Sequence, residues 1–435
     1  MVRAYVTSWF ILFSFLTFAQ GEWVYSKLRN MPKPTTNNAL IRVKSGNNNF
    51  VYSFGGVSDS LAPAGIHRST YKYNVTQNSW SKGLDIPDTL GKLNAKATLL
   101  KNRIYIIGGA YIDTADNNKR ITSNKVHVFN PFIDTFEVNA ANLPTPVENQ
   151  VQLAWRDSLI YVISGRSGNV NTPNVQVYNP SFDTWQKGTS LPDNDYFRAR
   201  GASGYLVGDT IFYFGGVSGP LISVTRGYLR KGVINRNKPF EIEWSFVDDI
   251  DEYRAYNPVV SGHKNRVFWF GGTGEEYNLK GKDVDTNRVQ PLNQIVNYHV
   301  QNKSLFGSSV DYSGMDLGGI AKLGGGNWLV AGGIDSLGNI SNRTLLMNNK
   351  SLSDIEDATQ PPSFIIVEFD EYYLIKTENI GTIDVYDISG RNIFNSHKSL
   401  ADLVVLKSDI KSNILIFVYN DGSNVPVTQK RVLLK

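Results

Sequence analysis

Arginines, tyrosines and a pair of acids recur in the segments of this chain that are best suited to carry chemistry. The candidates for ligand binding are Arg166, Arg198, Arg200, Tyr253, Arg254, Glu275 and Glu276. A guanidinium presents a planar fork of donors that matches a carboxylate, and a tyrosine ring can stack on a sugar face. Arginines beside tyrosines and a carboxylate pair therefore favour a clamp for an acidic sugar or a peptide. Taken singly, each of these residues is also explained as a solvated charge at the rim of a loop.

Chemistry that needs a thiol or a metal finds no support in the sequence. The chain has no cysteine, so thiolate ligands, disulfides and cysteine nucleophiles are excluded. Its five histidines are scattered, and none has the spacing of a metal-ligand pair. We therefore expect no metal, no cofactor and no catalytic residue, and we interpret the candidates above as a ligand-binding set.

The segments that carry these candidates belong to a repeat. Six short glycine signals, each after an apolar, strand-like run, recur about every 55 residues. They are Gly55-Gly56, Gly108-Gly109, Ser164-Gly165, Gly215-Gly216, Gly271-Gly272 and Gly332-Gly333. Glycine at a strand end allows a positive φ and a close backbone approach. The repetition predicts one supersecondary unit copied around an axis, with the candidates on its loops.

Each repeat continues with an aromatic residue placed after a turn. The same spacing separates Tyr73 from Trp80, Phe129 from Phe136, and Tyr178 from Trp185. Alternating apolar positions around these residues predict half-buried strands, four in each repeat. In the fourth repeat Tyr228 and Trp244 lie further apart. This insertion predicts a lengthened outer hairpin there.

The pattern of apolar run, Gly-Gly, aromatic and tryptophan resembles the Kelch repeat over residues 20–350. The resemblance implies an all-β fold, a six-bladed Kelch-type β-propeller with one blade for each glycine signal. The sixth repeat lacks its last strand, and residues 23–28 near the N-terminus can supply one. We expect that strand to complete the last blade, so that no sheet edge stays open.

The two ends of the chain fall outside the repeat. Residues 1–19 combine Arg3 with an apolar run and small residues at the cleavage position, which predicts a secretory signal peptide. Residues 351–362 are expected to be a linker, and residues 363–435 a small β-sandwich. The segments 383–391, 406–419 and 430–435 resemble the C-terminal sorting domain of type IX (Por) secretion substrates from certain Gram-negative bacteria. The resemblance implies that residues 363–435 engage the type IX secretion machinery. An ordinary β-sandwich appendage is the alternative.

Charge and hydropathy limit the partners. The net charge is +5 over 435 residues, with lysine and arginine dispersed, whereas nucleic-acid binding needs a concentrated basic face. No segment after the signal peptide has the apolar length of a bilayer span. We expect no nucleic-acid partner, no transmembrane span in the mature chain, and a secreted or outer cell-surface location reached through the periplasm.

Two functions fit these observations. The first is a non-catalytic module that binds glycan or protein ligands on the loop face, favoured because no nucleophile–base pair or metal set is present. The second is a sugar epimerase or mutarotase resembling the bacterial Kelch-type sialic-acid epimerases, which needs a carboxylate and an arginine on one face, such as Glu276 and Arg198. A copper-radical oxidase resembling galactose oxidase is excluded, because that family has seven blades and a cysteine-linked tyrosine. We expect the binding module.

Overall fold

The chain is built almost entirely from β-strands. The computed structural model describes residues 23–352 apart from 47, 220–222 and 284, followed by 365–368, 372–376, 381–387, 391–398, 403–409, 414–420 and 427–432. The predicted signal peptide, 1–19, and most of the predicted linker, 351–362, lie outside the described residues. Within the described residues, no helix has the length and apolar character needed to cross a bilayer.

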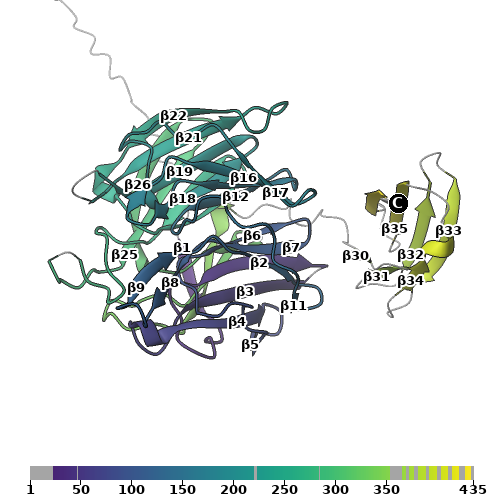
Figure 1. Ribbon diagram of the computed structural model, residues 1–435, viewed down its shortest axis with the longest axis horizontal. Helices are drawn as coiled ribbons and strands as arrows, with labels where there is room; N and C mark the ends of the chain where they lie inside the picture. The colour runs from purple at the N-terminus through teal and green to yellow at the C-terminus, as the bar shows by residue number, and fades with distance from the viewer. Residues whose placement is uncertain are drawn as a thin grey trace, which may run out of the picture.

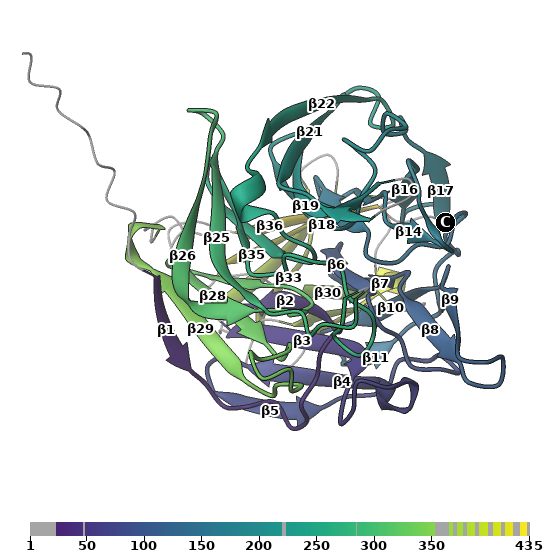
Figure 2. The same ribbon diagram turned by 90° about the vertical axis from the view of Figure 1, so that its left-hand side faces the viewer.

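Six antiparallel sheets of four main strands make up the described part of residues 23–352 (Figures 1 and 2). Blade 1 contains β2 (Ala39–Ser45), β3 (Asn48–Val57), β4 (Ile66–Asn74) and β5 (Ser79–Lys82). Blade 2 contains β6 (Lys96–Leu100), β7 (Arg103–Ile107), β10 (Val126–Asn130) and β11 (Thr135–Phe136). Blade 3 contains β12 (Val151–Trp155), β13 (Leu159–Ile163), β16 (Val175–Asn179) and β17 (Thr184–Lys187).

The remaining three sheets follow the same order. Blade 4 contains β18 (Arg200–Val207), β19 (Thr210–Ser218), β21 (Tyr228–Ile234) and β22 (Ile242–Asp249). Blade 5 contains β23 (Val259–His263), β24 (Arg266–Phe270), β25 (Leu292–His299) and β26 (Ser304–Gly314). Blade 6 contains β27 (Ala321–Gly324), β28 (Asn327–Ala331) and β29 (Thr344–Asn349), with β1 (Trp23–Lys27) as its fourth strand.

Strand β1 closes the ring of blades as the sequence predicts. It pairs antiparallel with β29, from Trp23 opposite Asn349 to Lys27 opposite Leu345, and it lies at the edge of the β28–β29 sheet in Figure 2. The Trp23 indole packs against Trp328 and Phe268, with ring centroids 5.4 and 5.2 Å apart. The first strand of the described chain therefore joins the last blade and buries its aromatic side chain between blades 5 and 6.

The glycine pairs are required because the blades approach one another there through their backbones. The first member of each pair has a positive φ, and the N–H of the second donates to a carbonyl just before the inner strand of the next blade, at 2.7–3.0 Å in all six cases. A Cβ on Gly215 would lie 2.4 Å from the Ala255 carbonyl oxygen. In blade 3 the first position is Ser164, whose Oγ accepts a hydrogen bond from the Ala199 N–H at 3.0 Å.

A second, inner ring of backbone hydrogen bonds surrounds the axis. Its members lie two residues before the start of the inner strand in blades 1, 2, 3 and 5, five residues before it in blade 6, and second in the strand in blade 4. All have a φ between 52° and 69°. We call these residues the axial ring: Asn37, Asn94, Asn149, Gly201, Asn257 and Asp316. Five members donate their backbone N–H to the carbonyl of the preceding member at 2.8–3.4 Å: Asn37, Asn94, Asn149, Gly201 and Asn257. Asparagine, aspartate and glycine are the residues that tolerate this left-handed backbone best.

The repeated aromatic residues tie the outer strands to the preceding blade. Trp80 lies opposite Tyr73, and its indole N–H donates to the Arg29 carbonyl at 3.0 Å. Trp244 lies opposite Gly232 in the long β21–β22 hairpin of blade 4, which confirms the predicted insertion. Its ring occupies the space that a Cβ on Gly232 would need, 2.3 Å away.

The described C-terminal strands form two further antiparallel sheets. One contains β30 (Ile365–Glu368), β31 (Tyr372–Lys376) and β34 (Leu403–Leu406). The other contains β33 (Asn392–Lys398), β32 (Gly381–Tyr386), β35 (Ile414–Asn420) and β36 (Val427–Val432). Side chains from both sheets, among them Tyr373 and Phe417, share one hydrophobic cluster. Two sheets around a common core are compatible with the small β-sandwich that the sequence predicts.

Replacing Gly215 by alanine tests the backbone approach between blades. Gly208 is the matched control, because its φ of +61° is also left-handed but no atom lies within 4 Å of an added Cβ. We expect Gly208→Ala to lower the free energy of unfolding by about 1–2 kcal/mol, the cost of a left-handed alanine. Gly215→Ala should cost about 2 kcal/mol more, because the Ala255 carbonyl must move. Equal urea-unfolding midpoints for the two variants would contradict the inter-blade contact.

Candidate functional site

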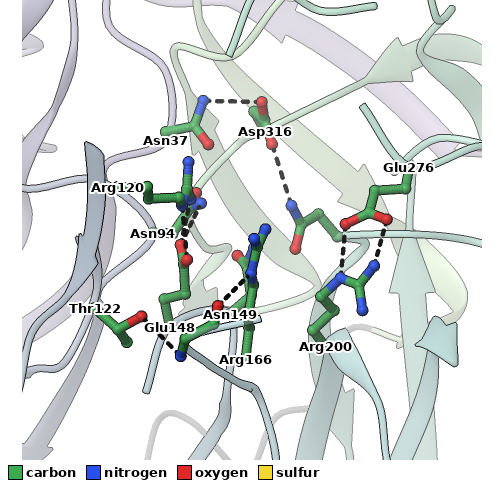
Figure 3. Close-up of polar contacts among 12 residues, drawn as sticks. Asn37, Asn94, Arg120, Thr122, Glu148, Asn149, Arg166, Arg200, Glu276 and Asp316 are labelled. Atoms are coloured by element: carbon green, nitrogen blue, oxygen red, sulfur yellow. Dashed lines mark hydrogen bonds and ion pairs between the residues drawn. The ribbon is translucent and has the colours of Figure 1, made fainter. Parts of the chain in front are cut away.

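The loops on one face of the propeller converge on the axial ring. They comprise the segments that lead into the inner strands and the insertions that follow the glycine pairs. Those insertions include the hairpin of β8 (Ala110–Asp113) with β9 (Lys119–Thr122), the hairpin of β14 (Arg166–Ser167) with β15 (Val170–Asn171), and strand β20 (Val224–Thr225). In blade 5 the insertion is the segment that begins at Thr273. Together they carry the charged groups drawn in Figure 3.

Arg200 and Glu276 form one buried ion pair on this face. Arg200 is the first residue of β18 and is 9% exposed. Its Nε donates to Glu276 Oε1 at 2.6 Å, and Nη2 donates to the second carboxylate oxygen. Its remaining donors bind Asn171 Oδ1 at 2.9 Å and Ser223 Oγ at 2.7 Å. Burial lowers the pKa of the guanidinium, but pairing with Glu276 outweighs burial and leaves the pKa above its ordinary value.

Arg120 and Glu148 form a second pair in blades 2 and 3 (Figure 3). Glu148 is fully buried. It accepts a hydrogen bond from Arg120 Nε at 2.7 Å and another from Nη2, and Asn94 Nδ2 donates to it at 3.2 Å. Burial lowers the pKa of Arg120, and pairing with Glu148 raises it above its ordinary value. Each pair thus fixes its carboxylate against a guanidinium through two hydrogen bonds.

Arg166 is the third guanidinium of this face, and it has no carboxylate partner among the described residues. Its backbone forms a β-bridge with Glu148, and in the view of Figure 3 its side chain lies between the two ion pairs. Its Nε donates to the Gly168 carbonyl at 2.8 Å, and Nη2 donates to Asn169 Oδ1 at 3.4 Å. Of these three guanidiniums, Arg166 is therefore the one available to pair with an anionic ligand.

Two tyrosines form the floor between the pairs and the axial ring. A Cβ on Gly201 would lie 2.3 Å from the Tyr256 ring, which explains why this ring position has no side chain. The Tyr256 hydroxyl accepts a hydrogen bond from Asn149 Nδ2 at 3.0 Å. Tyr277 stands edge-on to Tyr256 at 5.5 Å, and its hydroxyl donates to Asp316. Burial raises the pKa of both phenols well above the ordinary value, so both are protonated donors at neutral pH.

The blade 5 insertion crosses the axis and covers part of this floor. We call residues 273–282 the crossing segment. Glu276 reaches blade 4 through Arg200, and Tyr277 reaches the axial ring at Asp316. Leu279 packs on a small cluster formed by Val57 of blade 1 with residues of blade 2. The segment is therefore held at both sides of the axis, and a ligand that contacts both ion pairs must displace or slide beneath it.

The structure brings three of the seven predicted binding residues into this site: Arg166, Arg200 and Glu276. The others lie elsewhere. Arg198 pairs with Asp193 at 3.0 Å and Asp195 at 3.3 Å in its own loop. Arg254 pairs with Asp251 at 3.6 Å, with both side chains well exposed. Tyr253 packs beneath Gly307 in blade 5, and Glu275 is exposed beside Glu276. As ligand contacts, all seven remain predictions.

Glu148 is absent from the predicted set, although a signal for it exists in the sequence. It directly precedes an axial-ring residue, as do Arg200 in blade 4 and Tyr256 in blade 5. Aligning the repeats on Asn149, Gly201 and Asn257 places all three side chains at one position of the repeat. That alignment needs the ring to be recognised first. Among the described residues, no cluster of three or more histidine, aspartate or glutamate side chains is arranged to hold a metal ion.

The fold and the ring of blades define the chain as a Kelch-type β-propeller. The Kelch motif family matches residues 157–192, which contain β13, β16 and β17 of blade 3. The chain is 26% identical over 288 residues to the N-acetylneuraminate epimerase of Salmonella typhi, covering 55% of this chain and 72% of that protein. It also resembles the solved structure of YjhT, with a TM-score of 0.59 and 14% identity over 75% of this chain and 99% of that one. The structural likeness shows the fold.

Replacing Leu279 by alanine tests whether the crossing segment is anchored across the axis. Loss of most of this partly buried leucine side chain removes its packing on the cluster around Val57. We expect hydrogen–deuterium exchange of a peptide covering 274–282 to speed up by about tenfold, while peptides from the blade strands are unchanged. Leu337→Ala is the control, since Leu337 is 70% exposed in a blade 6 loop. Unchanged exchange in Leu279→Ala would show that the segment is held by other contacts.

Proposed function

We propose that this propeller is a sugar epimerase or mutarotase that acts on an acidic sugar bound over the axial ring. The observation that carries the proposal is the convergence of two largely buried Arg–Glu pairs with Arg166, whose guanidinium has no carboxylate partner among the described residues. Such chemistry requires a carboxylate and an arginine on one face. The sequence suggested Arg198 as the arginine beside Glu276, and in the structure Arg200 occupies that position. The similarity to an N-acetylneuraminate epimerase supports this choice over a non-catalytic binding module.

The geometry suggests a role for each group. Arg166 is available to hold the carboxylate of an acidic sugar, because its charge has no acidic partner among the described residues. Glu276 is the general base: it takes the proton of the anomeric hydroxyl as the bond between the anomeric carbon and the ring oxygen breaks. The same carboxyl then returns that proton to the ring oxygen, and closure from the other face gives the other anomer. Arg200 orients Glu276 through hydrogen bonds to both of its carboxylate oxygens.

Replacing Glu276 by glutamine tests this assignment. Starting from one anomer of N-acetylneuraminate, proton NMR gives the rate at which the anomers equilibrate. We expect Glu276→Gln to lower kcat/KM by about 100-fold or more, since general acid–base catalysis contributes that much. Glu275→Gln is the matched control, because the neighbouring carboxylate is exposed, and it should stay within about twofold. Binding of the sugar without any acceleration by the wild type would establish the non-catalytic module instead.

We further propose that the C-terminal residues direct export. Two sheets with a shared core among the described residues of 365–432 support an autonomous module, and the sequence resemblance to type IX sorting domains supports its role. Deleting residues 361–435 should leave the propeller in the periplasm, as fractionation and immunoblotting would show. Normal appearance of the truncated chain at the surface or in the medium would refute the sorting role.

A further inference from the structure

A cavity lies on the opposite side of the axial ring from the two ion pairs. It has a volume of about 430 Å³ and is lined by the inner strands of blades 1 to 5 and by residues 318–320, just before the inner strand of blade 6. Its lining residues come after the ring residues in sequence, whereas Glu148, Arg200 and Tyr256 precede them. The ring itself leaves only about 20 Å³ of space, close to the size of one water molecule. The cavity is therefore separate from the site on the loop face.

One end of this cavity is polar. Lys96, at the start of β6, lines both the cavity and the narrow space within the ring, so it marks the end nearest the ring. Gln150 follows the ring residue of blade 3, is fully buried, and keeps its Oε1 without a hydrogen-bond partner among the described residues. Other polar side chains of the lining are satisfied: Gln152 Nε2 donates to Thr98 Oγ1 at 2.8 Å, and Ser203 Oγ donates to the Pro258 carbonyl.

Lys96 is the single charged group among the described residues that line the cavity. Its ammonium forms no ion pair or hydrogen bond with the described residues. Burial lowers its pKa, which the nearby Asp316 offsets only in part. The carboxylate of Asp316 is already engaged by Asn37 at 2.9 Å, by Asn257 and by Tyr277. The cavity thus contains a half-buried amine whose nearby counter-charge is committed elsewhere, and a charged group in such a place ordinarily has a partner.

The other end of the cavity is apolar. Residues further from the ring, on the inner strands or just before β27, contribute aliphatic side chains: Ile41, Leu99, Leu153, Leu206, Val260 and Ile320. Its volume falls in the range of small-molecule sites, which combine apolar walls with a few placed polar groups. A ligand that matches both ends has one carboxylate and an unbranched apolar chain.

We propose that this cavity binds a medium-chain monocarboxylate, with the carboxylate on Lys96 and the hydrocarbon chain along the aliphatic walls. The proposal does not depend on the function assigned to the loop face. It gives the propeller a second ligand on the same axis, separated from the first by the ring of backbone hydrogen bonds.

Calorimetric titration of the full chain at pH 7 tests the proposal with octanoate, octanol and octylammonium as probes. We expect octanoate to bind at least about tenfold more tightly than octanol, and octylammonium to bind more weakly than either, because the pocket's charge is positive. Lys96→Met keeps the length of the side chain and removes the charge. It should reduce octanoate binding at least about tenfold and leave octanol unchanged.

Two further variants separate this cavity from other surfaces. Lys322→Met removes a lysine of β27 that does not line the cavity, and Arg200→Gln removes a guanidinium of the loop face. Both should bind octanoate as the wild type does. The proposal is overturned if octanoate binds no better than octanol, if Lys96→Met binds as the wild type does, or if Arg200→Gln abolishes binding. The wild-type series decides the matter even where Lys96→Met fails to fold.

Discussion

The hydrogen bond between the second residue of each glycine pair and the next blade is the contact on which the rest of the propeller depends. It joins two backbones at 2.7–3.0 Å. In the five blades with glycine at the first position, an added Cβ would lie 2.2–2.7 Å from the accepting carbonyl oxygen, whereas blade 3 accommodates Ser164 there. Six such contacts fix how far each blade stands from its neighbour and turn successive sheets around one axis. The axial ring, its left-handed residues and the narrow passage through it follow from that spacing.

The same constraint builds the loop-face site. Because the residue before each ring position is held beside the axis, blades 3, 4 and 5 bring Glu148, Arg200 and Tyr256 together although they are far apart in the sequence. The blade insertions then add Arg120, Arg166, Glu276 and Tyr277 from the outside. Burial makes the Arg–Glu pairs costly to break, so they hold the face in one arrangement before a ligand arrives.

Repetition made the fold predictable, because it samples the same physical requirement six times. The glycine pairs, the aromatic residue after each turn and the closing strand at Trp23 all lie where the pattern places them. The site was harder to predict, since it depends on which blades lie near one another across the axis. Arg198 and Arg200 are equally plausible from the sequence, yet one pairs within its own loop and the other with Glu276.

Long-range contacts account for the features of the site that the sequence does not predict. Nothing local in the sequence indicates that Leu279 of blade 5 packs against Val57 of blade 1, or that Tyr256 fills the space left by Gly201. Local sequence does not indicate the place of Glu148 in the site, because its role depends on Arg120, which comes from an insertion of the preceding blade. In the sequence Lys96 does not differ from other strand lysines, and only the closed ring of blades places it in a cavity.

The central claim is that the axial ring assembles one anion-binding site for an acidic sugar on the loop face. A crystal structure of the chain with N-acetylneuraminate tests it most directly. We predict that the sugar carboxylate lies within hydrogen-bond distance of Arg166 and the anomeric hydroxyl within reach of Glu276, with the crossing segment displaced or closed over the ligand. A sugar bound on another surface, or one that leaves both Arg166 and Glu276 without a contact, would contradict it.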